Sequence, residues 1–140
     1  MKVTEKLAIS AEDFFKCMIE SAAHDVKEHT GKTLTRNQLA GFEYKKVLGQ
    51  KQSARLKITK IVDNQTYQFV TKTGLNEFEV TYSIQALDAN HCEVTYLENV
   101  VSHGKMRTLN DKIVGGFVGF FRKKNVKRLL HAIEQTAVQA

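Results

Sequence analysis

The sequence predicts an α+β domain in which a few helices pack against an antiparallel sheet. Three observations favour this class: an early segment with apolar residues at helical spacing, five consecutive segments that alternate apolar and polar residues, and a long final segment without proline. The chain has 140 residues, of which 42% are hydrophobic and 26% charged. A chain of about 100 to 200 residues normally forms one domain, so we expect a single domain over residues 1–140 with one hydrophobic core.

The first elements are predicted to be a strand and a helix. Val3, Leu7 and Ile9 share one parity with polar residues between them, which is typical of a strand. Ser10 offers a hydroxyl that can accept the free N–H groups at the start of a helix, and Gly31 supplies a C-terminal stop. Between these two residues, apolar side chains recur every three or four positions at Phe14, Phe15, Met18, Ile19, Ala22 and Val26.

The middle of the chain is predicted to be an antiparallel meander of five strands. A short helix over Arg36–Ala40 precedes it. The strands are expected at Phe42–Leu48, Ser53–Val62, Thr66–Thr73, Glu77–Leu87 and Cys92–Val101. The breaks between them contain Gly, Asn and Asp, which tolerate tight turns. The alternation inside the strands predicts one apolar face and one solvated face.

The last segment, from Lys105 to about Val138, is predicted to be helical. Its apolar side chains switch sides, because those up to Phe121 lie on one side of the cylinder and the later ones on the other. Either the helix kinks or breaks near Arg122–Asn125, or it is straight and buries the side that carries Gly115, Gly116, Gly119, Val126, Leu129, Leu130 and Ile133. In the straight case the phenylalanine side needs a cover from the first helix, a membrane surface or a second copy in a homodimer.

The basic excess of the chain is concentrated near its C-terminus. The formal net charge is +6, and eight basic residues between Lys105 and His131 stand against one acid, Asp111. We predict a basic patch formed by Arg122, Lys123, Lys124, Lys127 and Arg128. Such a patch attracts an anionic membrane or an acidic protein, and the alternative is a solvated helix face. Nucleic acid is not an expected partner, because the neighbouring phenylalanines are expected in the core or an interface rather than exposed for stacking.

No motif for a catalytic nucleophile, a metal or a nucleotide cofactor occurs in the sequence. His24 and His29 are about 140° apart on a helix, so they do not share a ligating face. No apolar stretch reaches the ~20 residues that span a bilayer, and the N-terminus lacks the apolar core of a signal peptide. The cysteines, Cys17 and Cys92, form no C-x-x-C pair. We therefore expect a cytoplasmic protein with no metal and no cofactor.

The predicted order of elements, β-α-α-β-β-β-β-β-α, resembles the helix-grip fold of the START-like (SRPBCC) superfamily. Three short motifs, Gly41–Tyr44, Leu109–Asp111 and Gly116–Lys124, are similar to a small family of uncharacterised proteins, a domain of unknown function, from low-GC Gram-positive bacteria. The resemblance implies a curved antiparallel sheet wrapped on the long C-terminal helix. It also implies a cavity between sheet and helix, which in relatives holds hydrophobic or amphipathic molecules.

On this basis we expect a ligand-binding cavity lined by Tyr44, Leu56, Ile58, Tyr67, Phe69, Phe78, Val80, Tyr82, Tyr96, Glu98, Gly116, Phe117 and Phe120. The strand residues of this set share the apolar parity of the meander, and inward tyrosines can orient the polar head of a lipid-like ligand. The alternative is that the rings only fill the core. A second hypothesis is a cavity enzyme of cyclase or hydrolase type with Glu98 or a tyrosine as general acid or base. A third is an interaction module that acts through the basic patch.

Overall fold

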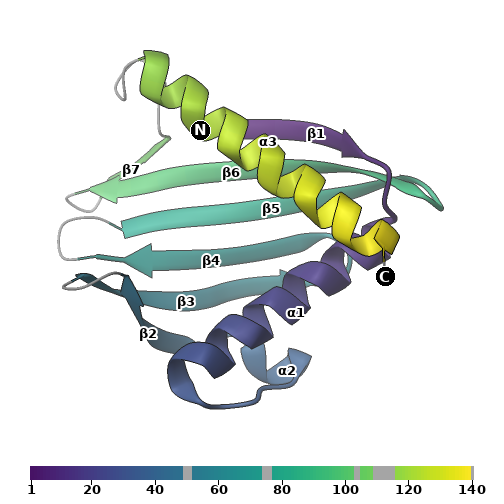
Figure 1. Cartoon of the computed structure of the whole chain (residues 1–140). Coiled ribbons are helices and arrows are strands. Elements are labelled where there is room, and N and C mark those ends of the chain that lie inside the picture. The colour runs from purple at the N-terminus through teal and green to yellow at the C-terminus, as the bar shows by residue number, and fades with distance from the viewer. Residues whose placement is uncertain (49–51, 74–76, 103–104, 109–115, 140) are drawn as a thin grey trace.

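The computed structural model describes residues 1–48, 52–73, 77–102, 105–108 and 116–139, and their side chains except those of 48, 52, 101–102, 105–108, 116–122 and 136–139. The elements follow in the order β1 (Lys2–Leu7), α1 (Ala11–Thr30), α2 (Arg36–Leu39), β2 (Glu43–Leu48), β3 (Gln52–Val62), β4 (Thr66–Lys72), β5 (Glu77–Asp88), β6 (His91–Ser102), β7 (Lys105–Thr108) and α3 (Gly116–Gln139). A curved sheet carries α1 and α3 on the same face (Figure 1).

The sheet contains the predicted meander. Its strand order is β1-β6-β5-β4-β3-β2, and each described pair is antiparallel. Strands β2 to β6 are neighbours in chain order, so the five-stranded meander is confirmed. The first strand closes the sheet on the other side, where Lys2 pairs with Leu97 and Leu7 pairs with Cys92. The α+β helix-grip arrangement predicted from the sequence is therefore correct.

One prediction about the last segment is wrong. Residues 105–108 were expected at the start of the helix, but they form β7, which pairs with the end of β6 from Asn99 to Ser102. The reason lies in the register of β1, which pairs with β6 only as far as Leu97 and leaves the remaining edge of β6 available. Backbone groups on that edge need partners, and β7 supplies them. Within the part of the chain that the structure describes, the helix runs from Gly116 to Gln139.

Helix α1 begins and ends as its capping residues predict. The Asp13 N–H donates to the Ser10 side-chain oxygen at 3.0 Å, which satisfies one of the free N–H groups of the first turn. Gly31 adopts a left-handed conformation with φ 75°, and its N–H donates to the Lys27 carbonyl at 2.8 Å. The apolar side of the helix faces the sheet and buries Phe14, Phe15, Met18, Ala22 and Val26.

Helix α3 continues without a break through residues 122–125 and is straight there (Figure 1), so of the two alternatives the straight helix is the one observed. Leu130 is fully buried, while Val126 and Ile133 pack at the edge of the core. This is the side predicted for a straight helix, with the correction that Leu129 is 47% exposed. The side chains of the phenylalanines at 117, 120 and 121 lie outside the description.

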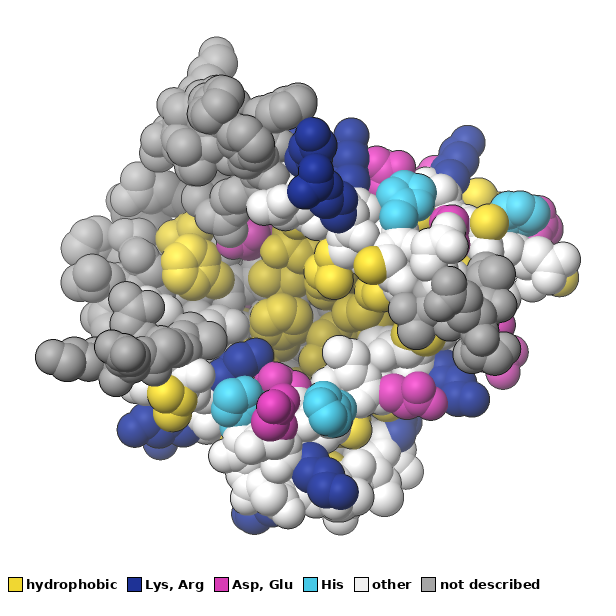
Figure 2. Space-filling model, in the orientation of Figure 1, with side chains coloured by type: hydrophobic (Ala, Val, Ile, Leu, Met, Phe, Trp, Pro, Cys, Tyr) yellow, Lys and Arg dark blue, Asp and Glu magenta, His cyan; other side chains and the backbone are white. Residues whose placement is uncertain are grey.

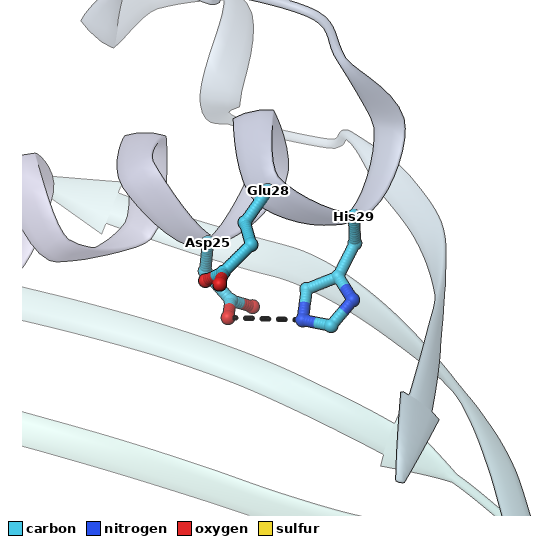
Figure 3. A group of neighbouring side chains, drawn as sticks. All are labelled: Asp25, Glu28 and His29. Atoms are coloured by element: carbon cyan, nitrogen blue, oxygen red, sulfur yellow. Dashed lines mark ion pairs between the residues drawn. The ribbon is translucent and has the colours of Figure 1, made fainter.

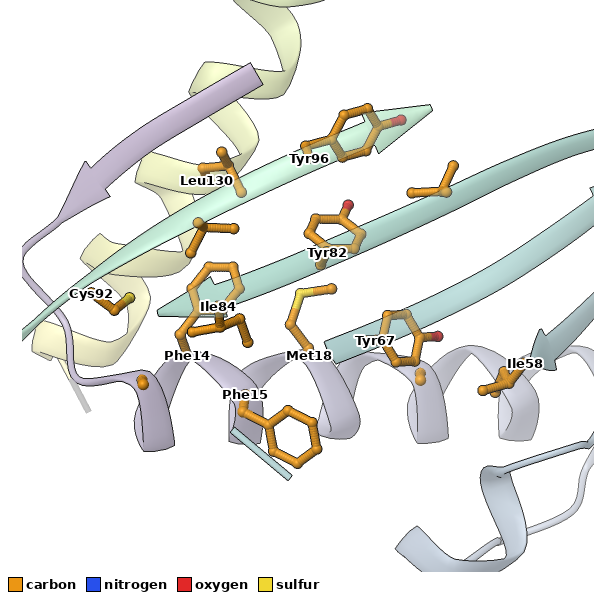
Figure 4. Packing of buried hydrophobic residues seen from close by; sticks show 14 of the residues in the cluster. Phe14, Phe15, Met18, Ile58, Tyr67, Tyr82, Ile84, Cys92, Tyr96 and Leu130 are labelled. Carbon is orange, nitrogen blue, oxygen red and sulfur yellow. The ribbon is translucent and has the colours of Figure 1, made fainter. Parts of the chain in front are cut away.

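The two helices meet at one end of the sheet and diverge toward the other (Figure 1). At the closed end, the Ala8 N–H donates to Glu134 Oε2 at 2.9 Å, which ties α3 to the segment between β1 and α1. Leu130 and Cys92 both belong to the buried core (Figure 4). The divergence leaves part of the inner face of the sheet without a helix over it.

Candidate functional site: a cavity between the first helix and the sheet

A hollow opens where α1 and α3 diverge, with apolar side chains at its bottom (Figure 2). Part of it is a cavity of about 260 Å³ between α1 and the inner face of β2 to β5. Its lining residues are Met18, Ser21, Ala22, His24, Asp25, Tyr44, Lys46, Leu56, Tyr67, Phe69 and Tyr82. The wall therefore combines apolar side chains with a small number of polar ones, which is the usual composition of a ligand pocket.

A row of tyrosines crosses the inner face of the sheet beside the cavity (Figure 4). Tyr67 on β4 is the register partner of Tyr82 on β5, which in turn is the partner of Tyr96 on β6. Direct cross-strand partners point to the same face, so the alternation of the sequence places all three rings together. The ring centroids lie 6.2 Å apart for the first pair and 5.2 Å apart, edge to face, for the second.

Burial favours the protonated form of the cavity tyrosines. It is the largest cause of the raised pKa of Tyr67 and of Tyr82, and the pKa of Tyr82 rises to about 12. These phenols therefore keep their protons at neutral pH. In this state they act as hydrogen-bond donors, whereas a general base would have to lose the proton first.

A buried carboxylate lies at the end of the tyrosine row. Glu98 is 4% exposed, and the Tyr96 hydroxyl donates to its Oε2 at 2.9 Å. Glu98 is the register partner of Val80, so it points to the same face as the row. The sequence predicted this orientation from the parity of the strand. A hydrogen bond from a phenol is the kind of partner that a buried carboxylate requires.

A network of polar side chains joins α1 to β2 at the edge of the cavity. Asp25 on the helix accepts hydrogen bonds from the Tyr44 hydroxyl and from Lys46 Nζ, the latter at 3.1 and 3.2 Å. His29 Nε2 lies 3.5 Å from Asp25 Oδ1. Burial alone would raise the pKa of the Asp25 carboxyl, but the hydrogen bonds and the nearby positive charges outweigh it and hold the pKa below its ordinary value. Asp25 is thus ionised at neutral pH.

Asp25, Glu28 and His29 also form the type of group that can hold a metal ion (Figure 3). One ligand atom from each lies within 4.8 Å of the others. The Lys46 ammonium, however, already occupies a position next to both oxygens of Asp25. A divalent cation would have to displace this ammonium, so the arrangement is that of an ion-pair network rather than a preformed metal site.

The structure places the predicted lining residues as follows. Tyr44, Leu56, Tyr67, Phe69 and Tyr82 line the cavity. The register puts Ile58, Phe78, Val80, Tyr96 and Glu98 on the same face of the sheet, where all but Phe78 are buried. Gly116, Phe117 and Phe120 belong to α3, but their side chains lie outside the described part of the chain. Ligand binding by this set stays a prediction.

The predicted basic patch lies on α3. Lys124, Lys127 and Arg128 are exposed and Lys123 is half-buried, while the side chain of Arg122 is outside the description. Lys127 Nζ lies 3.6 Å from Glu5 Oε1, so one charge of the patch is shared with β1. Among the described helices, none combines the length and the apolar character needed to cross a membrane.

Asp25 is the main residue of the site that sequence reasoning missed. It lies seven positions after Met18 and three after Ala22, so it follows the apolar side of α1 although it carries a charge. A charged residue on that side needs a polar partner on the element it faces. The parity of β2, which places Lys46 on the same side as Tyr44, indicated where that partner lies.

A second and larger depression, of about 760 Å³, lies where the turn at residues 63–66 and the end of β5 meet the start of α1. It is lined mainly by polar side chains and turn residues, among them Ser10, Glu12, Asp63 and Asp88. Its described lining residues include none of the buried aromatic and ionisable groups that surround the smaller cavity. We therefore take the smaller cavity as the candidate site.

Comparisons with known proteins show the family and the fold. A family model described as a domain of unknown function (DUF3284) matches residues 1–119, and none of the curated proteins matches the sequence. A START superfamily protein from Mycobacterium smegmatis is 13% identical, with a TM-score of 0.63 over 99% of this chain and 97% of its own. A norcoclaurine synthase point mutant from Thalictrum flavum, in complex with a transition-state analogue, is 10% identical, with a TM-score of 0.63 over 99% and 93%.

DynU16, from the dynemicin biosynthetic locus, is 9% identical with a TM-score of 0.60 over 96% of this chain. This chain spans only 45% of DynU16. At such identities the likeness concerns the fold alone. It confirms the START-like helix-grip architecture that the order of predicted elements indicated.

Proposed function

This chain belongs to the DUF3284 family of domains of unknown function, and from that premise we propose a function on the basis of its own cavity: it binds a small hydrophobic or amphipathic molecule between α1 and the sheet. The observation that carries the proposal is the cavity of about 260 Å³ with aromatic and aliphatic walls. Ligand pockets measure about 300 to 1,000 Å³, so a cavity near the lower limit suits a small molecule.

The wall chemistry supports an amphipathic occupant. Met18, Leu56 and Phe69 supply apolar surface, and burial of apolar ligand surface against them gives about 25 cal/mol per Å². Asp25 and Lys46 place charged groups at the edge of the cavity, and the tyrosines of the sheet add hydroxyls to its wall. An apolar body with a few polar groups matches this distribution.

The fold supports the same conclusion. The norcoclaurine synthase described above holds a transition-state analogue, so the helix-grip architecture can accommodate a small molecule. Its catalytic activity is not transferred to this chain, because the likeness concerns the fold alone. Here the protonated tyrosines and the ion-paired Asp25 favour binding over acid–base catalysis.

Titration with naphthalene, followed by ligand-observed NMR, tests the proposal. We expect one molecule to bind per chain. Ser21→Trp places a large ring at the exposed mouth of the cavity and should weaken binding by about tenfold or more, since overpacking costs about 1 to 3 kcal/mol. Lys27→Trp, on an exposed position of α1 that does not line the cavity, is the matched control and should bind normally. Failure of the wild type to bind both naphthalene and naphthalenes that carry a polar substituent, or equal binding by Ser21→Trp, would refute the proposal.

A second candidate function is contact with an anionic membrane through α3. The observation that favours it is the exposure of Lys124 and Arg128 beside Leu129, which is 47% exposed. Sedimentation with phosphatidylglycerol vesicles should show binding that decreases with salt and with the double substitution Lys124→Glu and Arg128→Glu. Equal sedimentation with uncharged phosphatidylcholine vesicles would contradict it.

A further inference from the structure

The hydroxyls of Tyr67 and Tyr82 are polar groups of buried residues that face the cavity. Both residues line it, and each is only 6% exposed. Within the part of the chain that the structure describes, neither hydroxyl has a hydrogen-bond partner, and neither is sealed away from the cavity. The hydroxyls of Tyr44 and Tyr96, by contrast, are held by carboxylates. A buried phenol normally has a partner, so the missing partner is expected in the molecule that fills the cavity.

We propose that the ligand has an apolar frame that carries uncharged oxygen acceptors, such as ketone or ester carbonyls, and that Tyr67 and Tyr82 donate hydrogen bonds to them. This inference rests on the proposed function and specifies the chemical class of its ligand. The two rings belong to register partners on neighbouring strands and their centroids lie 6.2 Å apart. One small molecule can therefore contact both.

The surroundings favour an uncharged acceptor over a carboxylate. Asp25 acts on Tyr67 and Glu98 acts on Tyr82, and in both cases the negative charge adds to the effect of burial in raising the phenol pKa. Both phenols therefore remain donors at neutral pH. Lys46 offsets part of the charge of Asp25, but an anionic ligand group placed against the two phenols would still be repelled by Glu98. A carbonyl oxygen would accept the hydrogen bonds without this repulsion.

A pure hydrocarbon chain is a poorer occupant of the same space. It would displace water from both hydroxyls and leave them without a partner, and an unpaired buried hydroxyl is costly. The cavity should therefore discriminate between two molecules of nearly the same shape when only one of them carries a carbonyl.

Three naphthalene probes test this discrimination: 2-acetylnaphthalene, 2-ethylnaphthalene and 2-naphthoate. They share a ring system and differ in whether the substituent is an uncharged acceptor, apolar or anionic. We expect the wild type to bind the ketone about tenfold more tightly than either of the others, because a buried hydrogen bond contributes about that factor. Carbon-13 NMR of the labelled ketone should show the carbonyl resonance moving downfield on binding, as hydrogen bonding requires.

The variant Tyr67→Phe/Tyr82→Phe removes both hydroxyls and keeps both rings. It should bind the ketone and the ethyl compound with nearly equal affinity and abolish the downfield shift. The control is Thr95→Val, which also removes a hydroxyl with little change of shape, but on the opposite face of the sheet, where Thr95 contacts Thr4. This control should retain the tenfold preference, and thermal unfolding verifies that each variant is folded.

Equal binding of the ketone and the ethyl compound by the wild type would overturn the inference and leave the proposed function intact. The inference also fails if the double variant keeps the preference, or if 2-naphthoate binds most tightly. Failure of all three probes to bind would overturn the proposed function itself, and the inference with it.

Discussion

Asp25 connects helix and sheet at the level of a single residue, and its charge stabilises the fold. Its folded-state pKa lies below the ordinary value of 3.8, so its stabilising contribution is present above that pH and is lost as pH falls through the lower, folded value. We predict that Asp25→Asn lowers the free energy of unfolding by about 1 to 2 kcal/mol at pH 7. The difference from the wild type should shrink once the pH falls below 3.8.

Urea unfolding at a series of pH values measures this difference. Glu28→Gln is the matched control: its carboxylate lies near Asp25 but accepts none of the hydrogen bonds that hold Asp25, and among the described residues its ion pair is with His24, at 3.8 Å and between exposed side chains. An exposed pair contributes little, so the control should remain within about 0.5 kcal/mol of the wild type. If the difference in free energy of unfolding between the wild type and Asp25→Asn stayed constant from pH 7 to pH 2, the charge of Asp25 would not be the cause of the stabilisation.

The two cysteines differ in accessibility and should differ in reactivity. Cys92 is fully buried, and burial, with Glu134 as the next cause, raises the pKa of its thiol to about 11. Cys17 is only partly buried. We predict that iodoacetamide at pH 8 alkylates Cys17 first in the native protein and that Cys92 reacts only after unfolding in urea, as peptide mass spectrometry can establish. Equal rates under native conditions would contradict the burial of Cys92.

At the scale of elements, the docking of α3 depends on one side of the helix. Leu130 is fully buried, while its neighbour Leu129 is 47% exposed. We predict that Leu130→Ala lowers the free energy of unfolding by about 2 to 5 kcal/mol, because it leaves a cavity in the core. Leu129→Ala should cost less than about 1 kcal/mol. Urea unfolding of both variants compares the same substitution at adjacent positions. Similar decreases in the free energy of unfolding for the two variants would contradict the orientation of α3.

The elements that depend on local pattern were predictable, and those that depend on distant pairing were not. Ser10 and Gly31 are capping residues, so their residue types alone indicate where α1 begins and ends. The alternation of apolar and polar residues in β5 is likewise visible in its sequence. Residues 105–108 alternate too briefly to distinguish a strand from a helical turn. Their state is decided by β6, whose edge β1 leaves open, and this information lies in the register between elements far apart in sequence.

At the scale of the molecule, part of the candidate site could be predicted from the sequence. The parity of the strands placed Tyr44, Tyr67 and Tyr82 on one face, and all three line the cavity. Asp25 was missed because its role comes from the way α1 crosses β2, which periodicity within one element does not specify. The α3 side of the expected cavity falls on side chains outside the description.

The divergence of the two helices has an energetic consequence for the whole molecule: the unfilled space between α1 and the sheet lowers stability, and under the proposed function it is the space that the ligand occupies. Ala22 is buried and lines the cavity, so Ala22→Met should fill part of it. We predict that the free energy of unfolding rises by about 0.5 to 1 kcal/mol while naphthalene affinity falls by about tenfold. Ala132→Met, exposed on α3, should change neither quantity appreciably. Because filling the space must move stability and affinity in opposite directions, a variant that loses stability and keeps affinity would show that the ligand binds elsewhere.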